Sequence, residues 1–174
     1  MRLLKKSVHN SLKNLEGNPY VRRAARGIII RGSKILLLYT KRYDDYSFPG
    51  GGVEPHEDLL EGLKRELAEE TGARDIEVSD HYGIYEEFRP VRYEKFDFMH
   101  MISHFYTCTI AEELGKSDLE DYEIKNGMSA QWIDIHEAIA HNRDVMSKKD
   151  EKMGLSIERE THVLELIASE FLKL

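Results

Sequence analysis

The hydrophobic and polar positions along the chain predict a series of strands separated by loops and helices. Runs of β-branched, aliphatic and aromatic residues mark the strands, and Gly32 and Ser33 between the first two predict a hairpin. Pro90 lies in the connection between the third and the fourth, which predicts a wide hairpin. The predicted strands cover residues 21–31, 34–39, 76–87, 96–111 and 130–134.

A helical spacing of apolar residues marks the remaining segments. In residues 1–20 the spacing predicts a short helix that ends near Gly17 and Pro19, and Asp134 can cap a helix after the last strand. The predicted helices lie within residues 1–20 and over residues 57–70, 135–141 and 157–172, whereas residues 41–52 and 112–126 are predicted as connectors. Helices and strands in this order predict an α/β sandwich with a mixed sheet.

The helix predicted over residues 57–70 carries three carboxylates on one surface. Glu66, Glu69 and Glu70 are spaced i, i+3 and i+4, next to an apolar stripe of leucines. Like charges at this spacing repel, so they indicate either a solvated acidic face or a bound cation. Because every candidate ligand is a carboxylate oxygen, the pattern favours a hard ion such as Mg²⁺ or Mn²⁺.

The whole segment around this helix carries a longer pattern. Glycines at 50–52 form a loop that leads into the helix, and the charged positions of the helix follow at fixed intervals. From residue 51 the sequence reads G-G-V-E-P-H-E-D-L-L-E-G-L-K-R-E-L-A-E-E-T-G-A. This segment resembles the signature of the Nudix (MutT-like) hydrolases, with mild departures at His56 and Ala73. The resemblance implies a Nudix-type α/β/α sandwich over residues 1–174, a single domain with residues 1–20 as an N-terminal extension.

The resemblance also implies a reaction, namely attack by water on a diphosphate linkage in a nucleoside diphosphate derivative. It implies that Mg²⁺ or Mn²⁺ is held by Glu66, Glu69 and Glu70 together with a backbone carbonyl near Gly51. Arg65 would be a catalytic helper, with Glu57 as the partner of its guanidinium group. A divalent ion would neutralise the diphosphate oxygens and acidify a water molecule.

Other roles stay open at this stage. The general base is either a glutamate of the helix or an acid of the loop before residues 130–134, where Glu120, Asp121 and Glu123 are candidates. Several cationic and aromatic side chains are candidates for binding the substrate, although each could equally serve the surface or the core. They are Arg22, Arg23, Arg26, Lys41, Arg42, Arg89 and Arg92 for phosphate, and Tyr46 and Phe48 for a base.

The substrate itself is not specified by the sequence. Pro90, seventeen positions after Ala73, favours ADP-ribose-like substrates, whereas Tyr82 and Tyr85 favour dinucleoside polyphosphates. Damaged nucleoside triphosphates are a third possibility. An alternative function is a nucleotide-binding sensor that keeps the fold without turnover.

Composition and charge narrow the function classes. The chain has 174 residues and a net charge of -7, which argues against non-specific binding to a polynucleotide. No apolar run is long enough for a membrane span, and Cys108 is the single cysteine. We therefore expect a cytoplasmic protein with a small nucleotide as its ligand and no polynucleotide or membrane partner. A homodimer is a further possibility.

A rival metal site is the series His100, His104 and Cys108, spaced by four residues. On a helix this spacing would indicate zinc. The segment is predicted as a strand, however, where four residues span roughly 13 Å, so one ion could not be shared.

Overall fold

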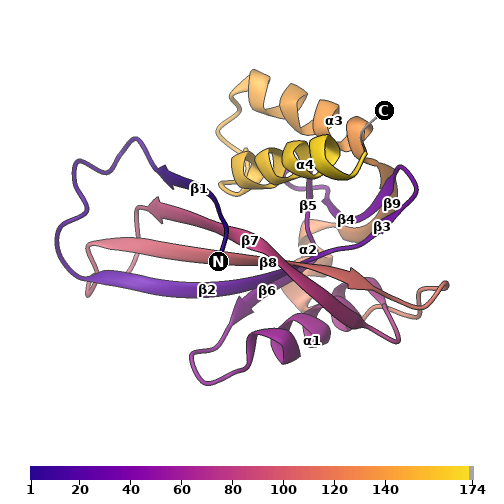
Figure 1. The fold of residues 1–174 in the computed structure, drawn as a ribbon. Helices are drawn as coiled ribbons and strands as arrows, with labels where there is room; N and C mark the ends of the chain where they lie inside the picture. Colours follow the sequence, from indigo (N-terminus) through magenta and orange to yellow (C-terminus); the bar gives the residue numbers. More distant parts are fainter. Residues whose placement is uncertain (173–174) are drawn as a thin grey trace.

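The computed structural model describes residues 1–172, which form two sheets with helices on both sides (Figure 1). The larger sheet has the order β1-β7-β8-β2-β6. Its strands are β1 (Leu3–Val8), β2 (Pro19–Ile28), β6 (Gly50–Val53), β7 (Glu77–Arg89) and β8 (Phe98–Thr109). The sheet is mixed, because β1 runs parallel to β7 and β2 runs parallel to β8, while the β7–β8 and β2–β6 pairs are antiparallel.

The smaller sheet is antiparallel and centres on one strand. It consists of β3 (Ile30–Arg31), β4 (Lys34–Thr40), β5 (Asp45–Ser47) and β9 (Met128–Asp134). Strand β4 pairs with each of the other three. The hairpin predicted around Gly32 is confirmed, since Arg31 pairs with Lys34 across the turn.

The helices lie on opposite faces of the sheets, as the predicted sandwich requires. They are α1 (Leu59–Thr71), α2 (Asp121–Asn126), α3 (Ile135–Lys148) and α4 (Ile157–Phe171). One buried cluster, which includes Leu63 and Leu67, joins α1 to one side of the structure, and another, which includes Val163 and Leu164, joins α3 and α4 to the other (Figure 1). The α/β class and the mixed sheet are therefore confirmed. Among residues 1–172, no helix is both long enough and apolar enough to cross a membrane.

The prediction of a helix at the N-terminus was wrong. Residues 3–8 form β1, which pairs with residues 84–88 of β7, and Leu4 packs against Gly83 and the larger hydrophobic core. A Cβ atom at Gly83 would lie 2.6 Å from a methyl carbon of Leu4, so this close approach depends on the missing side chain. Tertiary pairing with a long strand has overridden a weak local helical pattern.

The connectors contain more regular structure than the sequence predicted. Residues 41–52 include β5 and most of β6, and residues 112–126 include α2. Helix α3 is capped by Asp134 as predicted, but it continues to Lys148 instead of ending at His141. Strand β6 was missed because it pairs with β2, which is distant in the sequence. Strand β5 and helix α2, of three and six residues, are too short to show a clear periodicity.

Candidate functional site

Helix α1 is placed by its caps and by its apolar face. The Asp58 side chain accepts hydrogen bonds from the backbone N–H groups of Leu60 and Glu61, at 2.9 and 3.1 Å. At the other end Gly72 adopts a left-handed φ of 72°, and its N–H donates to the carbonyl of Ala68. The fully buried Leu63 and Leu67 then fix the rotation of the helix, which turns the glutamate face toward the glycine strand β6.

Glu70 is the most buried carboxylate on this face. The residue is only 5% exposed, and its Oε2 accepts a hydrogen bond of 2.7 Å from the N–H of Gly50. Burial raises the pKa of Glu70 to about 8, and the charges of Glu66 and Glu123 add to the shift. Burial, followed by repulsion from Glu69 and Glu123, likewise raises the pKa of Glu66. The site therefore concentrates negative charge that the protein does not neutralise completely.

The glycine strand reaches these carboxylates because it carries no side chains. Gly50 has a φ of 125°, and a Cβ atom there would lie 2.1 Å from the carbonyl oxygen of Ala25 in β2. A Cβ at Gly51 would lie 3.2 Å from Oε2 of Glu66. Glycine is required at position 50 by both its conformation and its neighbours, and it allows the backbone to lie directly beside the acidic face.

Arg65 bridges the acidic residues at the mouth of the site. Its Nε donates to Oε1 of Glu57 at 3.2 Å, and its Nη1 donates to Oε1 of Glu66 at 2.7 Å and to Oε2 of Glu69 at 3.3 Å. The expected Arg65–Glu57 contact is thus present. Glu66 and Glu69 are both held by this guanidinium group, and of the two only Glu66 lines the cavity described below.

The loop acids before β9 are separated by their surroundings. Glu123 is only 6% exposed, its Oε2 accepts from the N–H of Glu120 at 2.7 Å, and its pKa is raised by burial and then by Glu120. Its charge acts on both Glu66 and Glu70. Glu120 is exposed and lines the cavity that Glu66 and Glu70 also line, whereas Asp121 and Glu123 do not line it. Glu123 instead lines a smaller cavity together with Glu70. Glu123 is therefore the loop carboxylate that shares the electrostatic environment of the helix glutamates.

These groups surround a cavity of about 460 Å³, which we call the acidic cavity. Its lining includes Tyr122, which is 60% exposed, and Met101, neither of which the sequence singled out. Tyr122 was missed because it lies in the connector where no helix was predicted. The acidic cavity is lined by Arg22, Ala24, Arg26, Gly50, Gly51, Gly52, Glu54, Arg65, Glu66, Glu70, Met101, Glu120 and Tyr122.

The residues predicted to bind the substrate lie at several separate sites in the structure. Arg26 lines the acidic cavity, with its Nη1 3.9 Å from Glu160 and 3.4 Å from the carbonyl oxygen of Phe48, while its Nε is buried without a hydrogen-bond partner. The prediction for Phe48 was wrong, because this residue is 0% exposed and packs edge to face on Phe105. Its ring has no free face for a base.

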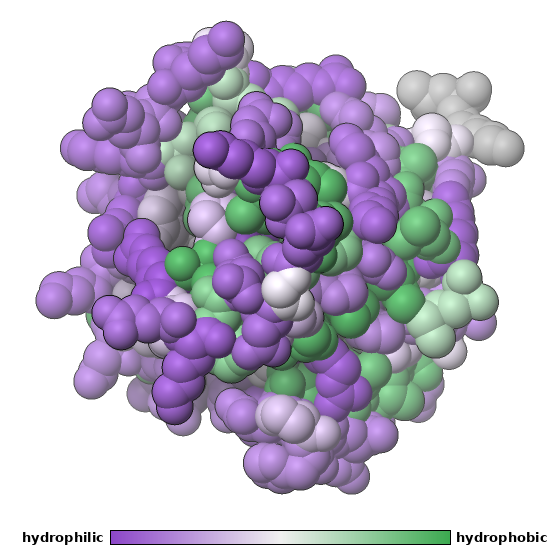
Figure 2. All heavy atoms as spheres, turned by 90° about the vertical axis from the view of Figure 1, so that its left-hand side faces the viewer, coloured by the Kyte–Doolittle hydropathy of each residue, from purple (hydrophilic) through white to green (hydrophobic). Residues whose placement is uncertain are grey.

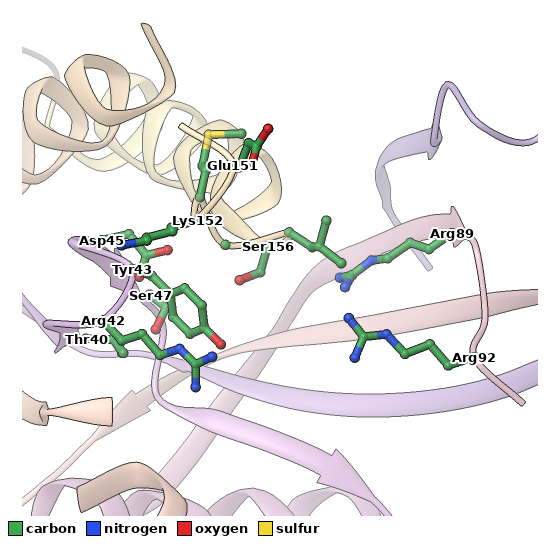
Figure 3. A pocket seen from close by; sticks show the side chains of 13 residues that line it. Thr40, Arg42, Tyr43, Asp45, Ser47, Arg89, Arg92, Glu151, Lys152 and Ser156 are labelled. Carbon is green, nitrogen blue, oxygen red and sulfur yellow. The ribbon is translucent and has the colours of Figure 1, made fainter. Parts of the chain in front are cut away.

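Tyr46 is also directed elsewhere. It is half-buried, its ring packs on those of Tyr39 and His141 at 5.2 Å, and it does not line the acidic cavity. Arg42 and Arg89 line a second, larger cleft of about 870 Å³ (Figure 3). We call this second site the basic cleft.

No group of three or more His, Cys, Asp or Glu side chains within residues 1–172 is arranged to hold a metal ion. The zinc alternative fails for the expected reason, since His100 lies on strand β8 beside Glu86 and His104 lies beside His81. For the glutamates, Arg65 takes part of the space and charge that a metal ion would use. The donor set nevertheless fits Mg²⁺ or Mn²⁺, because it consists of carboxylate oxygens, and Glu66 and Glu70 are buried enough for their pKa values to be raised.

Comparison with known proteins identifies the family. The profile of the NUDIX domain matches residues 21–153. The chain belongs to the Nudix family. Members of this family generally use divalent metal ions.

Curated relatives in this family carry different names. Human diphosphoinositol polyphosphate phosphohydrolase 3-alpha is 28% identical over 110 residues, which are 63% of this chain and 60% of that protein. The rat diphosphoinositol polyphosphate phosphohydrolase 2 is 32% identical over 107 residues, 61% of this chain and 52% of the relative. The 8-oxo-dGTP diphosphatase of Buchnera aphidicola is 46% identical over 52 residues, 28% of this chain and 40% of the relative. This Nudix chain thus matches only about half to three fifths of the length of the diphosphoinositol relatives.

Solved structures agree on the fold. The E. coli ORF135 protein superimposes with a TM-score of 0.54 at 19% identity and covers 87% of this chain and 93% of its own. A NUDIX hydrolase from Nitrosomonas europaea gives a TM-score of 0.56 at 19% identity, with 71% and 79% covered. At this identity the likeness supports the Nudix fold alone.

Proposed function

We propose that this Nudix chain hydrolyses a diphosphate linkage in a nucleoside diphosphate derivative or a similar phosphate anhydride. The observation that carries the proposal is the buried Glu70, held by the N–H of Gly50 and surrounded by the charges of Glu66 and Glu123. Buried carboxylates gathered beside an open cavity are expensive unless a cation binds them. The names of the curated relatives, phosphohydrolase and diphosphatase, are consistent with this chemistry.

Glu66, Glu69 and Glu70 are the residues proposed to hold Mg²⁺ or Mn²⁺, with the backbone of Gly51 beside them. When bound, the ion would neutralise diphosphate oxygens and lower the pKa of a water molecule. Arg65 would then turn away from Glu66, which its half-exposed position permits, and remain fixed by Glu57. Glu57 and Arg65 therefore act on the orientation of the ligands.

Glu123 is the proposed general base. Its charge acts on Glu66 and Glu70, and a raised pKa brings a glutamate closer to the range in which it exchanges protons near neutral pH. Glu120 remains the alternative, because it is exposed and lines the cavity. Arg26 lines the acidic cavity close to Glu70 and Glu160, and its guanidinium group is proposed to contact a phosphate oxygen.

The test is a substrate panel assayed with Mg²⁺, with Mn²⁺ and with a chelator. The panel contains nucleoside triphosphates, 8-oxo-dGTP, ADP-ribose, dinucleoside polyphosphates and a diphosphoinositol polyphosphate. We expect metal-dependent product from at least one compound, and loss of that product in Glu66→Gln. Glu61→Gln is a matched control, since Glu61 lies exposed on the same helix and should leave the rate unchanged. Affinity for a compound without any product would favour the catalytically silent sensor instead.

A further inference from the structure

The basic cleft is built from three segments that are far apart in the sequence. Arg42 follows strand β4, Arg89 and Arg92 lie at the end of β7 and just after it, and residues 151–156 lead into helix α4. In Figure 3 the guanidinium groups of Arg89 and Arg92 enter from one side, and Arg42 lies on the opposite side, below Tyr43. Three guanidinium groups therefore border one cavity.

The charge of the cleft is predominantly positive. Besides the three arginines, Lys152 lines it, and the acidic lining residues are Asp45 and Glu151. The Glu151 side chain points away from the arginines in Figure 3, and Asp45 is buried, which raises its pKa to about 6. The acids thus offset only part of the cationic charge.

The protein itself neutralises these cations only in part. Within residues 1–172, no ion pair involves Arg42, Arg92 or Lys152, although Arg42 donates to the amide oxygen of Asn126 at 3.1 Å. Arg89 is paired with Glu87 at 2.9 Å, but that carboxylate is shared with the buried Arg159, and the Nε of Arg89 is buried without a partner. The protein therefore neutralises the cationic charge of the cleft only in part, which favours binding of an anion there.

The amino end of a long helix opens at the same place. Ser156 is the N-cap of α4, and its side chain makes no capping hydrogen bond. Gly154, Leu155 and Ser156 all line the cleft. The positive end of the α4 dipole is therefore added to the arginines.

The basic cleft is continuous with the acidic cavity. Thr40, Tyr43 and Ser47 line both the basic cleft and a smaller cavity of about 190 Å³. That smaller cavity in turn shares its lining with the acidic cavity, through Arg26, Gly50, Glu70 and Tyr122. One elongated molecule can therefore lie with its anhydride at Glu70 and its other end among the arginines.

We propose that the basic cleft binds a second phosphorylated part of the substrate, so that the substrate class is a molecule with phosphate groups beyond the linkage that is cut. This inference rests on the proposed function for the position of the cut, but not for the binding of phosphate in the cleft. Arg42, Arg89 and Arg92 bind the phosphate oxygens, and Lys152 contributes charge at the rim. Two sources of such phosphates fit this chemistry: the polyphosphate of a dinucleoside polyphosphate, and the ring phosphates of an inositol polyphosphate.

The test is calorimetric binding without metal, so that no hydrolysis is needed. The probes are inositol hexakisphosphate, diadenosine pentaphosphate and, as the compound without additional phosphate, ADP-ribose. We expect Arg42→Gln/Arg92→Gln to weaken binding of one of the first two probes by about tenfold or more, and binding of ADP-ribose by much less. The probe with the larger loss identifies the source of the phosphate.

The matched control is Lys5→Gln/Lys13→Gln, which removes the same total charge from exposed positions outside the cleft. Arg42 and Arg92 are exposed, so an unchanged thermal midpoint is expected in all variants. Equal weakening in the control, or no weakening in the cleft variant, would overturn the proposal. If the cleft variant hydrolyses ADP-ribose at the wild-type rate, the proposed function is unaffected by the result for the cleft. If the protein binds phosphate in the cleft but hydrolyses no compound, the proposed function alone is rejected.

Discussion

The acidic cavity and the basic cleft differ in which parts of the chain form them. In the acidic cavity, most of the chemistry comes from one continuous segment, in which Gly50 and the glutamates of α1 are brought together by a turn and one helix. In the basic cleft, Arg42, Arg92 and Lys152 come from segments that meet only in the folded protein. Both sites collect like charges and leave them partly unpaired, which is costly unless a ligand of opposite charge binds. The difference indicates a cation in the first site and an anion in the second.

A buried ionic network lies between the two sites. Arg159 donates to Glu160 and Glu87, each at 2.6 Å, and all three residues are buried. Glu87 pairs with Arg89 of the basic cleft, and Glu160 accepts from the N–H of Phe48, two residues before Gly50. The network therefore fixes the backbone of one site and a cation of the other.

The largest effect is expected from removing a charge in the acidic cavity. Glu70→Gln keeps the shape and the hydrogen bond from Gly50 but removes the charge, so the hydrolytic rate should fall on the order of 10³-fold. Steady-state assay on the best compound of the substrate panel measures this loss. A Glu70→Gln enzyme with the wild-type rate would place the chemistry outside the acidic cavity.

The two loop acids provide a sharper test of the same cavity. Because Glu123 is buried beside the helix glutamates, Glu123→Gln should lower kcat by about 10²-fold, the usual range for a general base. Glu120→Gln should lower it by only a few fold. The two variants are compared in kcat over a pH series, and the reverse order of the two losses would make Glu120 the base.

The carboxylate of Asp45 in the basic cleft should make the free energy of unfolding depend on pH. Burial, and then the charge of Glu160, raises the pKa of Asp45 to about 6. Because the pKa of Asp45 in the folded state lies above its pKa in the unfolded state, the contribution of Asp45 to stability is fully present at low pH. It is lost as the pH rises through about 6. Asp45→Asn should therefore raise the free energy of unfolding by on the order of 2 kcal/mol at about pH 8, and by almost nothing at about pH 4.

Urea denaturation at the two pH values measures this difference. Asp144→Asn is the matched control on the surface, where pairing with Lys148 lowers the pKa of the carboxyl. An equal gain for Asp45→Asn at both pH values would show that its charge is not penalised in the folded protein.

A smaller effect than at Glu70 or Glu123 is expected for the residues that orient the glutamates. Glu57 holds Arg65 and does not line the acidic cavity, so Glu57→Gln should cost about tenfold in kcat/KM, less than the change at Glu70. Arg65→Lys should cost a similar amount, because an ammonium group cannot bridge several carboxylates as a guanidinium group does. A loss at Glu57 as large as that at Glu70 would contradict its placement as an orienting residue.

The comparison also explains what the sequence could predict. The acidic cavity was largely predictable, because Glu66, Glu69 and Glu70 share a face of one helix and Gly50 to Gly52 directly precede it. The choice between Glu120 and Glu123 was not, since it depends on a helix of six residues whose capping decides which side chain is buried. Arg42 and Arg89 were candidates for binding the substrate, but their meeting in one cleft could not be predicted. That cleft and strand β1 both depend on contacts between segments that are distant in the chain.

The central claim is that Glu66 and Glu70 together hold a divalent cation in the acidic cavity. Electron paramagnetic resonance of added Mn²⁺ tests it most directly, on the wild-type protein and on Glu66→Gln/Glu70→Gln. The account predicts that the wild type removes Mn²⁺ from solution with a saturable signal and that the double variant does not. Equal Mn²⁺ binding by both proteins, or none by the wild type in the presence of substrate, would contradict it.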